Sequence, residues 1–337
     1  MMTFINLDPT SSVPKYQQIV NSIIKAIDEN SLKIGDKLPS VNELSVYTGL
    51  ANKTVVQAFD QLKQIGVISS VQYKGYFVSS SNTQSKHNIF LLFNSLTAYK
   101  EQIYESIKES LNNKGIVDIY FHHNDTEIFN TLIEQSVGKY TEYIIMPIDD
   151  PVKNESLLKL PQDKIYIIDL GYKDLGTKYP SVCQYFDEDI YNALSEGLAR
   201  AKKYKKLILV LGPSTSKKLL DNIQAGFTQF CQENEFEWEV ILRVKNRKPL
   251  TGELYIILND QDLVSLVKKV SELALTLGTD VGIISYNEIP FKEITANGIA
   301  TISTDFTKMG KEIIRLILNK KREHIKNPSY LTNRNSF

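Results

Sequence analysis

The sequence predicts an α/β protein in which a small N-terminal domain of helices and a hairpin precedes a larger domain of two parallel-sheet lobes. Residues 11–78 hold closely spaced helix-start and helix-end signals, followed by a short hairpin pattern. From Ile89 onward, apolar strand-like runs alternate with amphipathic stretches, as in parallel strands joined by crossover helices. These runs exceed one comfortable sheet. We therefore expect two lobes, with the chain crossing between them near Leu170 and again near Ser285.

The first expected element is a core helix close to the N-terminus. Ser11 or Ser12 can cap this helix, and Pro14 lies in its first turn, where a missing N–H costs nothing. The apolar residues that follow recur at helical spacing, which places them on one buried stripe. They are Tyr16, Ile19, Val20, Ile23, Ile24 and Ile27.

Two further helices are expected within residues 40–66. Ser40 and Glu43 form a capping box for a short helix, and Gly49 supplies the left-handed residue that ends it. Asn52 then caps a longer helix, which Gly66 closes. Two short helices joined by a tight turn form a helix-turn-helix, whose second helix can enter a DNA major groove. Taken alone, the same pattern also fits a surface helical hairpin.

A hairpin completes the N-terminal domain. Residues 67–78 are strand-like and turn at Tyr73-Lys74-Gly75, so the order of elements is helix, helix, helix, hairpin. This order is that of a winged helix-turn-helix. Polar residues on its expected recognition surfaces are the candidate DNA contacts: Lys37, Ser40, Asn42, Asn52, Lys53, Thr54, Gln57, Tyr73 and Lys74.

The charged and amide residues of this domain favour recognition of A·T base pairs. Residues 1–80 contain seven lysines, six carboxylates and no arginine. Arginine reads guanine, whereas Asn and Gln match the N6 and N7 groups of adenine. We expect Asn42, Asn52 and Gln57 to read bases in double-stranded operator DNA, and the lysines at 53 and 74 to contact phosphates. The alternative role for Asn52 is helix capping alone.

A series of residues between positions 14 and 78 matches a known pattern in register. They are Pro14, Tyr16, Gly35-Asp36-Lys37-Leu38-Pro39-Ser40, Glu43-Leu44, Thr54-Val55, Ala58, Leu62, Gly66 and Gly75-Tyr76-Phe77-Val78. Through them the domain resembles the DNA-binding domain of the GntR family of bacterial transcription regulators. This resemblance implies a winged helix that binds operator DNA. Family members usually place Arg at the positions of Asn42, Asn52 and Val56, and often at Lys74.

Length and composition bound the remaining possibilities. A chain of 337 residues suits two domains, and 42% hydrophobic with 23% charged residues is typical of a soluble globular protein. We expect a cytoplasmic protein with no membrane partner, because no apolar run could span a bilayer and no secretory leader begins at Met1. Cys183 and Cys231 lack metal-ligand spacing, so we expect neither a metal nor another cofactor. We expect domains at 1–78 and 89–337, joined by a polar linker at 79–88.

The larger half contains a second set of ordered motifs. They are Pro147-Ile148-Asp149-Asp150, Asp187, Gly226-Phe227, Leu258-Asn259-Asp260, residues 280–287, Thr301-Ile302, Asp305, Met309-Gly310 and Arg334-Asn335-Ser336. In this order they resemble the effector-binding domain of the LacI/GalR regulators, which is similar to periplasmic-binding-protein-like sugar receptors of type I. The resemblance implies two lobes around a small sugar-like effector, and a homodimer. A GntR-type winged helix joined to such a domain is the architecture of arabinose-repressor-type regulators.

Ligands of open α/β sheets bind outside the carboxyl ends of the strands. The LacI/GalR resemblance implies that Ile223 replaces the family's effector-clamping Arg and that Asn287 replaces an Asp. Both changes favour a neutral monosaccharide or derivative over a sugar acid or phosphate. By resemblance and by their place after apolar strands, or as aromatic residues that could stack on a sugar, the candidate effector contacts are Asn94, Ser95, Tyr99, Asp149, Phe186, Asn259, Asp260 and Asn287.

These features predict a DNA-binding transcription regulator, a repressor whose operator binding changes when a sugar-like effector occupies the cleft. An activator built from the same parts is an alternative. A second alternative is an α/β sugar-acting enzyme with an accessory winged helix, although no nucleophile motif, phosphate loop or metal set accompanies it. A third is a vestigial cleft in a domain that only dimerises. We expect no catalytic residues.

Overall fold

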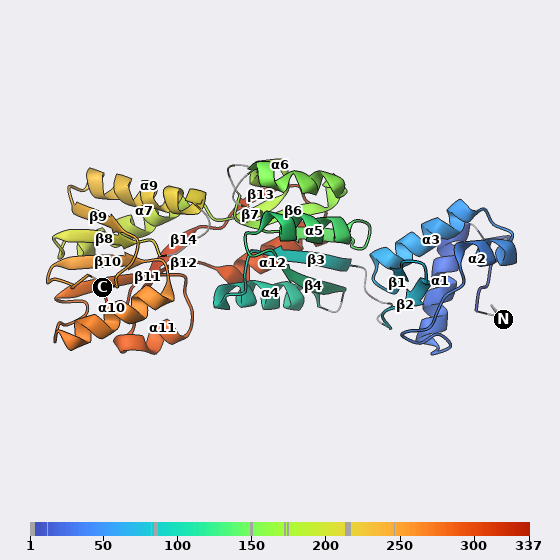
Figure 1. Cartoon of the computed structure of the whole chain (residues 1–337), viewed down its shortest axis with the longest axis horizontal. Helices are drawn as coiled ribbons and strands as arrows, with labels where there is room; N and C mark the ends of the chain where they lie inside the picture. Colours follow the sequence, from blue (N-terminus) through green and yellow to red (C-terminus); the bar gives the residue numbers. More distant parts are fainter. Residues whose placement is uncertain are drawn as a thin grey trace.

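The computed structural model describes residues 4–11, 13–81, 83, 87–112, 114–148, 151–171, 173, 175–212, 217–245 and 247–337. A winged helix lies at one end of the molecule, an N-terminal lobe lies in the middle and a C-terminal lobe lies at the far end (Figure 1). This arrangement confirms the predicted α/β fold class, with a small antiparallel wing and parallel sheets in both lobes.

The N-terminal domain has the predicted order of helices and hairpin. Its buried side chains include Leu44, Phe59 and Leu62, and the ring of Phe59 lies 4.6 Å from that of Tyr76 in the wing. The two wing strands pair antiparallel. The elements are α1 (Lys15–Asp28), α2 (Val41–Thr48), α3 (Asn52–Gln64), β1 (Ile68–Val71) and β2 (Gly75–Val78).

The helix ends of this domain agree with the sequence analysis except at two N-termini. Both hydrogen bonds of the Ser40–Glu43 capping box are present, and Gly49 has the expected left-handed backbone at φ +69°. Asn52, however, is the first residue of α3 and makes no capping bond, because Ala51 occupies the capping position. At α1 the capping position belongs to Pro14 rather than to a serine. The capping role considered for Asn52 is therefore wrong.

In its described part, the N-terminal lobe is built on a parallel sheet with the strand order β13-β7-β6-β5-β3-β4. The helices α4 and α12 pack together against it. Its strands are β3 (His87–Phe93), β4 (Gly115–Phe121), β5 (Glu142–Ile145), β6 (Ile165–Asp169), β7 (Ser181–Cys183) and β13 (His324–Lys326). Its helices are α4 (Ala98–Leu111), α5 (Thr126–Ser136), α6 (Leu175–Lys178), α12 (Phe306–Leu318), η1 (Pro151–Lys159) and η2 (Gln162–Lys164).

The C-terminal lobe has the strand order β14-β12-β11-β10-β8-β9, and β14 runs antiparallel to β12. The helices α7 and α9 pack against each other on this lobe. Its strands are β8 (Lys206–Val210), β9 (Glu237–Ile241), β10 (Glu253–Ile257), β11 (Val281–Tyr286), β12 (Ala300–Thr304) and β14 (Ser329–Thr332). Its helices are α7 (Phe186–Glu196), α8 (Leu198–Ala201), α9 (Lys217–Glu233), α10 (Asp260–Glu272), α11 (Phe291–Ile294) and η3 (Thr295–Asn297).

The chain passes between the lobes later than the sequence analysis predicted. It crosses after β7, after β12 and again between β13 and β14. The expected crossing near Leu170 is wrong because β7 still belongs to the first sheet. The expected crossing near Ser285 is wrong because β12 still belongs to the second sheet. Short segments after these strands therefore connect the two lobes.

The winged helix and the N-terminal lobe are separate along the chain. The strand β2 ends at Val78 and β3 begins at His87, two residues before the predicted start of the domain at Ile89. Across the described residues, no helix combines the length and apolar character needed to cross a membrane.

Candidate functional site

The candidate effector site is a cavity of about 300 Å³ between the two lobes. It lies at the carboxyl ends of strands from both sheets, where open α/β folds bind ligands. Its described lining residues are Asn94, Ser95, Tyr99, Asn124, Asp169, Leu170, Gln184, Phe186, Leu211, Leu219, Leu220, Ile223, Leu258, Asn259, Tyr286 and Asn287.

The structure brings most of the proposed effector contacts together. Asn94, Ser95, Tyr99, Phe186, Asn259 and Asn287 all line this cavity. Asp260 does not line it, because its carboxylate pairs with the Lys292 ammonium at 3.0 Å and remains half exposed. Asp149 lies outside the described residues.

In the N-terminal lobe, the buried Lys100 organises the loop that follows β3. Its side chain is 2% exposed, and its Nζ donates to Ser95 Oγ at 3.2 Å and to Asn94 Oδ1. Burial lowers the pKa of Lys100 to about 8, opposed by the negative charge of Asp169. The amide of Asn94 is thereby fixed at the edge of the cavity.

The acidic group of this wall is Asp169, at the end of β6. Gln184 Nε2 donates to its Oδ1 at 2.5 Å. Burial raises the pKa of Asp169, while the Gln184 hydrogen bond and the Lys100 charge act in the opposite direction. Beside it, the Tyr99 ring stacks on Phe306 of α12 at a centroid distance of 4.5 Å. This wall of the cavity therefore carries the Asp169 carboxyl group as an acceptor, the side-chain amides of Asn94 and Gln184, and the flat ring of Tyr99.

In the C-terminal lobe, a second buried lysine organises the loop after β11. Lys292 is 1% exposed, and its Nζ donates to the backbone carbonyls of Tyr286 at 2.7 Å and Asn287 at 2.8 Å. The Asp260 carboxylate supplies the counter-charge on the outer side. Burial lowers the pKa of Lys292, opposed by Asp260. The Asn287 side chain is thus presented to the cleft by a braced backbone.

Asn259 lines the cleft but its side chain is already engaged. Its Oδ1 accepts from Asp262 N at 2.9 Å as the cap of α10, and its Nδ2 donates to Asp262 Oδ2 at 2.8 Å. A Cβ on Gly212 would lie 2.2 Å from that Nδ2, so only glycine fits beside it. Asn259 therefore shapes the cavity more than it offers free hydrogen-bonding groups.

Three lining residues of this cavity have left-handed backbone conformations. Asn124, Asp169 and Asn287 have φ of +59°, +66° and +64°, and each follows or ends a strand. Non-glycine residues rarely adopt this conformation, and such strained positions cluster at functional sites.

Several lining residues were not predicted. Asp169 and Asn124 follow apolar strands, so the sequence held a signal for both. Gln184 had no such signal, and neither did Lys100 behind the wall, because a glutamine after a short strand and a lysine in a helix are usually solvated. Ile223 had been placed at an effector contact by the LacI/GalR resemblance, whereas the other aliphatic lining residues were not predicted: Leu211, Leu219, Leu220 and Leu258.

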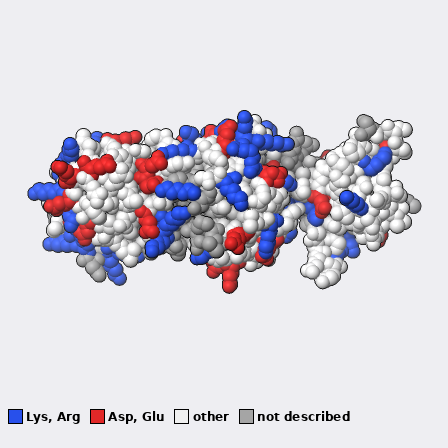
Figure 2. All heavy atoms as spheres, turned by 90° about the horizontal axis from the view of Figure 1, so that it is seen from above, with Lys and Arg blue, Asp and Glu red and all other residues white. Residues whose placement is uncertain are grey.

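The candidate DNA contacts lie on the surface of the winged helix. All of them are exposed except Thr54, which is half-buried, and Tyr73 at the wing tip is 98% exposed. Asn52 Nδ2 donates to Asn42 Oδ1 at 3.1 Å, which joins α2 and α3 at their exposed faces. The Ser40 hydroxyl is used in the capping box, where it accepts from Glu43 N at 3.2 Å. In the view of Figure 2, charge covers much of both lobes but little of the winged helix.

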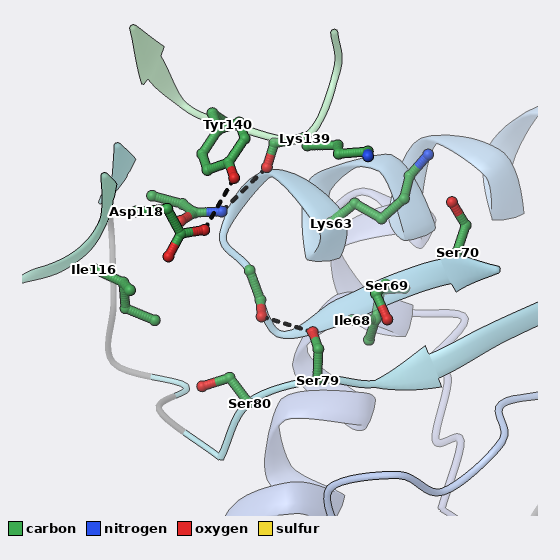
Figure 3. A pocket seen from close by; sticks show the side chains of 12 residues that line it. Lys63, Ile68, Ser69, Ser70, Ser79, Ser80, Ile116, Asp118, Lys139 and Tyr140 are labelled. Carbon is green, nitrogen blue, oxygen red and sulfur yellow. Dashed lines mark hydrogen bonds between the residues drawn. The ribbon is translucent and has the colours of Figure 1, made fainter. Parts of the chain in front are cut away.

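A second cavity, of about 430 Å³, separates the winged helix from the N-terminal lobe (Figure 3). On one side Ser79 Oγ donates to Gly66 O at 2.9 Å; on the other, Asn88 Nδ2 donates to Lys139 O at 3.1 Å. A Cβ on Gly66 would lie 3.1 Å from Asn88 Nδ2, so the domains touch at this point. This contact joins the N-terminal lobe to the winged helix.

Comparisons with known proteins identify the N-terminal domain. The model of the bacterial regulatory proteins of the gntR family matches residues 15–78. The HTH-type transcriptional repressor YtrA of Bacillus subtilis (strain 168) is 32% identical over 103 residues, which cover 31% of this chain and 75% of the relative. The chain belongs to the gntR family of bacterial regulatory proteins. It is therefore a transcription regulator and not an enzyme.

The larger domain of this gntR-family protein matches a second model, the periplasmic binding protein-like domain, over residues 198–337. The arabinose metabolism transcriptional repressor of Geobacillus stearothermophilus is 21% identical over 338 residues and covers 91% of each chain. A dimeric Lac repressor structure has a TM-score of 0.61 at 16% identity, covering 74% of this chain and 98% of that chain. The two lobes thus have the fold of LacI-type effector domains.

Proposed function

We propose that this regulator is a repressor whose operator binding changes when a small neutral monosaccharide or derivative occupies the interlobe cleft. The observation that carries the proposal is the convergence of Asn94, Asp169 and Asn287 on one cavity at the strand ends of both lobes. Amides and a carboxylate are the partners that sugar hydroxyls need, since each hydroxyl donates and accepts. Relatives named as repressors favour repression over activation.

A neutral effector fits the charges of the cleft. Among the described lining residues there is no Lys or Arg, and Ile223 lines the cavity where the LacI/GalR resemblance implies an effector-clamping Arg. The Lys100 amine lies behind the wall and is bonded to Asn94 and Ser95. A sugar acid or phosphate would enter beside the Asp169 carboxylate without a lining counter-charge. A regulator of similar fold from Alkaliphilus metalliredigens was crystallised with D-xylulofuranose, at 14% identity.

The DNA-binding half of the proposal concerns an A·T-biased operator. Asn42, Asn52 and Gln57 are exposed amides on α2 and α3, and amides match adenine in the major groove. Val56 is also exposed on α3, and an aliphatic group there suits a thymine methyl. Lys53 and Lys74 flank these residues as phosphate contacts.

We infer that the protein acts as a homodimer in the cytoplasm, where a palindromic operator would receive two winged helices. The Lac repressor, which shares the fold of the lobes, has been solved as a dimer on its operator. An effector that binds the open and closed lobe arrangements unequally would shift their populations. The hinge after β7 and β12 permits that movement, and the contact between Gly66 and Asn88 would pass it on.

A thermal-shift screen tests the proposed function. Neutral monosaccharides, sugar acids and sugar phosphates are added to the intact protein, since a ligand that binds only the folded state raises the melting temperature. We expect stabilisation by one or more neutral compounds, and loss of that shift in the variant Asn287→Ala. Stabilisation by sugar phosphates alone, or by no compound, would contradict the proposal.

A further inference from the structure

One edge of the N-terminal lobe faces the winged helix. It is the edge at which the parallel strands begin, opposite the cleft at their carboxyl ends. The chain enters it at His87, the first residue of β3, and residues near the starts of β3, β4 and β5 line the cavity between the two domains (Figure 3). A groove of about 800 Å³ lies at the same edge, over the starts of β3, β5 and β6 and the end of α12.

Basic side chains from separate segments gather at this edge, which we call the basic edge. Lys114, Lys139 and Lys164 each shortly precede a strand of the sheet, and Lys320 and Arg322 lie between α12 and β13. Lys139 lines the interdomain cavity, whereas Lys164, Lys320 and Arg322 line the groove. Segments far apart in the sequence therefore place cations on the side of the lobe that faces the winged helix.

These cations are available to an external anion. Within the part of the chain that the structure describes, the four lysines of the basic edge form no ion pair. Arg322 Nη1 donates to the backbone carbonyl of Asp163 at 2.9 Å, which orients the guanidinium without neutralising it. Glu142 pairs with His87 at 3.0 Å, and Asp118 and Asp163 offset part of the positive charge. An excess of cations remains.

Helix ends account for only part of this charge. The helices α4, α5 and α12 are followed by Lys114, Lys139 and Lys320, and the carbonyl end of a helix attracts a cation. That attraction is worth about 0.3–1 kcal/mol, and it leaves the ammonium groups able to bind another anion. Lys164 lies in η2 and follows no α-helix, so this attraction does not explain its position.

The winged helix itself has little positive charge to offer to DNA phosphates. Residues 1–80 contain seven lysines, six carboxylates and no arginine. Lys63 already pairs with Asp60 at 2.7 Å, and Lys25 pairs with Glu29 at 3.7 Å. Neutralisation of phosphates supplies a large share of the affinity of proteins for DNA. The neighbouring basic edge can supply the cations that the winged helix lacks.

We propose that the basic edge is a second DNA-contacting surface, which binds phosphates of the duplex beside the operator while the winged helix reads the bases. Lysine and arginine bind phosphodiester oxygens in any sequence, so this contact adds affinity and no base preference. The inference goes beyond the proposed function, because it requires DNA binding but no effector.

The test removes positive charge from the basic edge of the intact protein. The basic-edge variant combines Lys139→Gln, Lys164→Gln and Lys320→Gln. Its affinity for an operator duplex selected from random DNA is measured by fluorescence anisotropy over a range of salt concentrations. Each phosphate contact contributes about 0.9 to the slope of log affinity against log salt concentration, so we expect the slope to become shallower by about 1–3.

The length of the duplex provides a second measurement. The unchanged protein should bind a duplex extended by about one helical turn on each side of the operator more tightly than the operator alone. The basic-edge variant should bind both duplexes with the same affinity. An unchanged protein without this preference for the longer duplex would overturn the inference.

The matched control removes the same number of charges from the far end of the molecule. The distal variant combines Lys202→Gln, Lys203→Gln and Lys205→Gln, three exposed lysines that precede β8 on the side of the C-terminal lobe away from the cleft. It should keep the salt slope and the length preference of the unchanged protein. Equal slopes in the basic-edge and distal variants would overturn the inference.

Further measurements separate this inference from the other claims. Base preference should be the same in the basic-edge variant and the unchanged protein, and so should the shift in melting temperature caused by a cleft ligand. A basic-edge variant that loses base preference would contradict a purely phosphate-binding role. Melting curves report whether the variant keeps its fold, and the single substitution Lys139→Glu provides a second test. This substitution should also make the salt slope shallower.

Discussion

The two lobes hold their cleft residues by the same device applied to different atoms. Each has a buried lysine close behind the loop that carries a cleft asparagine. Lys100 of the N-terminal lobe donates to the side chains of Asn94 and Ser95. Lys292 of the C-terminal lobe donates to two backbone carbonyls and pairs with Asp260. One lysine orients side chains, whereas the other braces the chain itself.

This difference predicts which of the two lysines contributes mainly to stability and which contributes mainly to ligand binding. A buried carbonyl that loses its donor destabilises the folded state, because in the unfolded state water would satisfy it. A side-chain amide that loses its donor can turn to a new rotamer. Loss of Lys292 should therefore act mainly on stability, and loss of Lys100 mainly on ligand affinity.

The largest expected effect is the loss of stability caused by the substitution Lys292→Met. It leaves the Tyr286 and Asn287 carbonyls without their donor, and an unsatisfied buried acceptor costs about 1–3 kcal/mol. We expect the free energy of unfolding in urea to fall by about 3 kcal/mol. Lys268→Met, at an exposed lysine of α10 in the same lobe, is the control. Equal stability of the two variants would remove the proposed bracing role.

Acid should change the stability of the two lobes in opposite directions: it should destabilise the N-terminal lobe through His122 and stabilise the C-terminal lobe through Asp189. Burial lowers the pKa of His122 in the N-terminal lobe to about 4, and raises the pKa of Asp189 on α7 of the C-terminal lobe to about 6. His122 binds a proton more readily when unfolded, so its stabilisation is present above about pH 6.5 and is lost as pH falls toward 4. Protonated Asp189 stabilises the fold below about pH 4, and this contribution is lost as pH rises through 6.

The His122 contribution amounts to about 3 kcal/mol across that pH range. His122 Nδ1 accepts from Asn124 N at 3.1 Å, so its Nε2 is the donor to Met146 O at 3.2 Å. The variant His122→Gln keeps a donor without the titration. At pH 5, urea unfolding followed by far-UV circular dichroism should begin at a lower urea concentration than unfolding followed by the fluorescence of Trp238. Trp238 lies in β9 and therefore reports on the C-terminal lobe. At pH 7 this difference between the two signals should be smaller. Coincident transitions at pH 5 would refute the contrast.

A smaller effect on stability is expected for Lys100→Met. The Asn94 and Ser95 side chains lose one donor but can rearrange, so we expect the free energy of unfolding to fall by only about 1–2 kcal/mol. Ligand affinity, measured by calorimetry, should fall by about tenfold, since a hydrogen bond at the cleft edge is worth about 1.4 kcal/mol. Lys108→Met, at an exposed lysine of the same helix, should change neither quantity. Unchanged affinity in Lys100→Met would show that this lysine does not organise the cleft.

The last variant should leave the stability of both lobes unchanged. Asn52→Ala removes one member of the exposed Asn42–Asn52 pair, and a lost base contact costs about 1–3 kcal/mol of discrimination. In competition anisotropy assays with selected duplexes, we expect reduced preference for adenine at one position of each half-site. The control is Gln17→Ala on α1, outside the candidate contact set. An operator whose discriminating positions are all guanines would contradict the predicted base readers.

Local signals in the sequence predicted most of the architecture. The capping box at Ser40, the left-handed Gly49 and the hairpin turn at Tyr73 act within a few residues, so they can be read directly from the chain. The strand ends also located the cleft, because parallel strands gather their carboxyl ends at one edge. The lobe crossings were misplaced because β7 and β12 still pair with the strands before them, β6 and β11, so the chain crosses only after these additional strands.

The parts that could not be predicted depend on contacts between distant segments or on small shifts along a helix. Asp260 was paired with Asn259 as a cleft residue, but it is the first residue of α10 and turns outward to Lys292. Leu219 and Leu220 on α9 have the character of core residues, and only the structure shows that they line the cavity together with Ile223, which the LacI/GalR resemblance had already placed there. Buried lysines give no sequence signal because most lysines are exposed.

The central claim is that the cleft controls the winged helix. It is tested most directly by operator binding of the intact protein, measured by fluorescence anisotropy on a duplex selected from random DNA, with and without the tightest cleft ligand. We predict a change in operator affinity of about fivefold or more, the range of measured coupling between sites. The variant Asn287→Ala should reduce the ligand's effect while binding the free operator normally. An operator affinity that is the same at zero and saturating ligand would contradict the account.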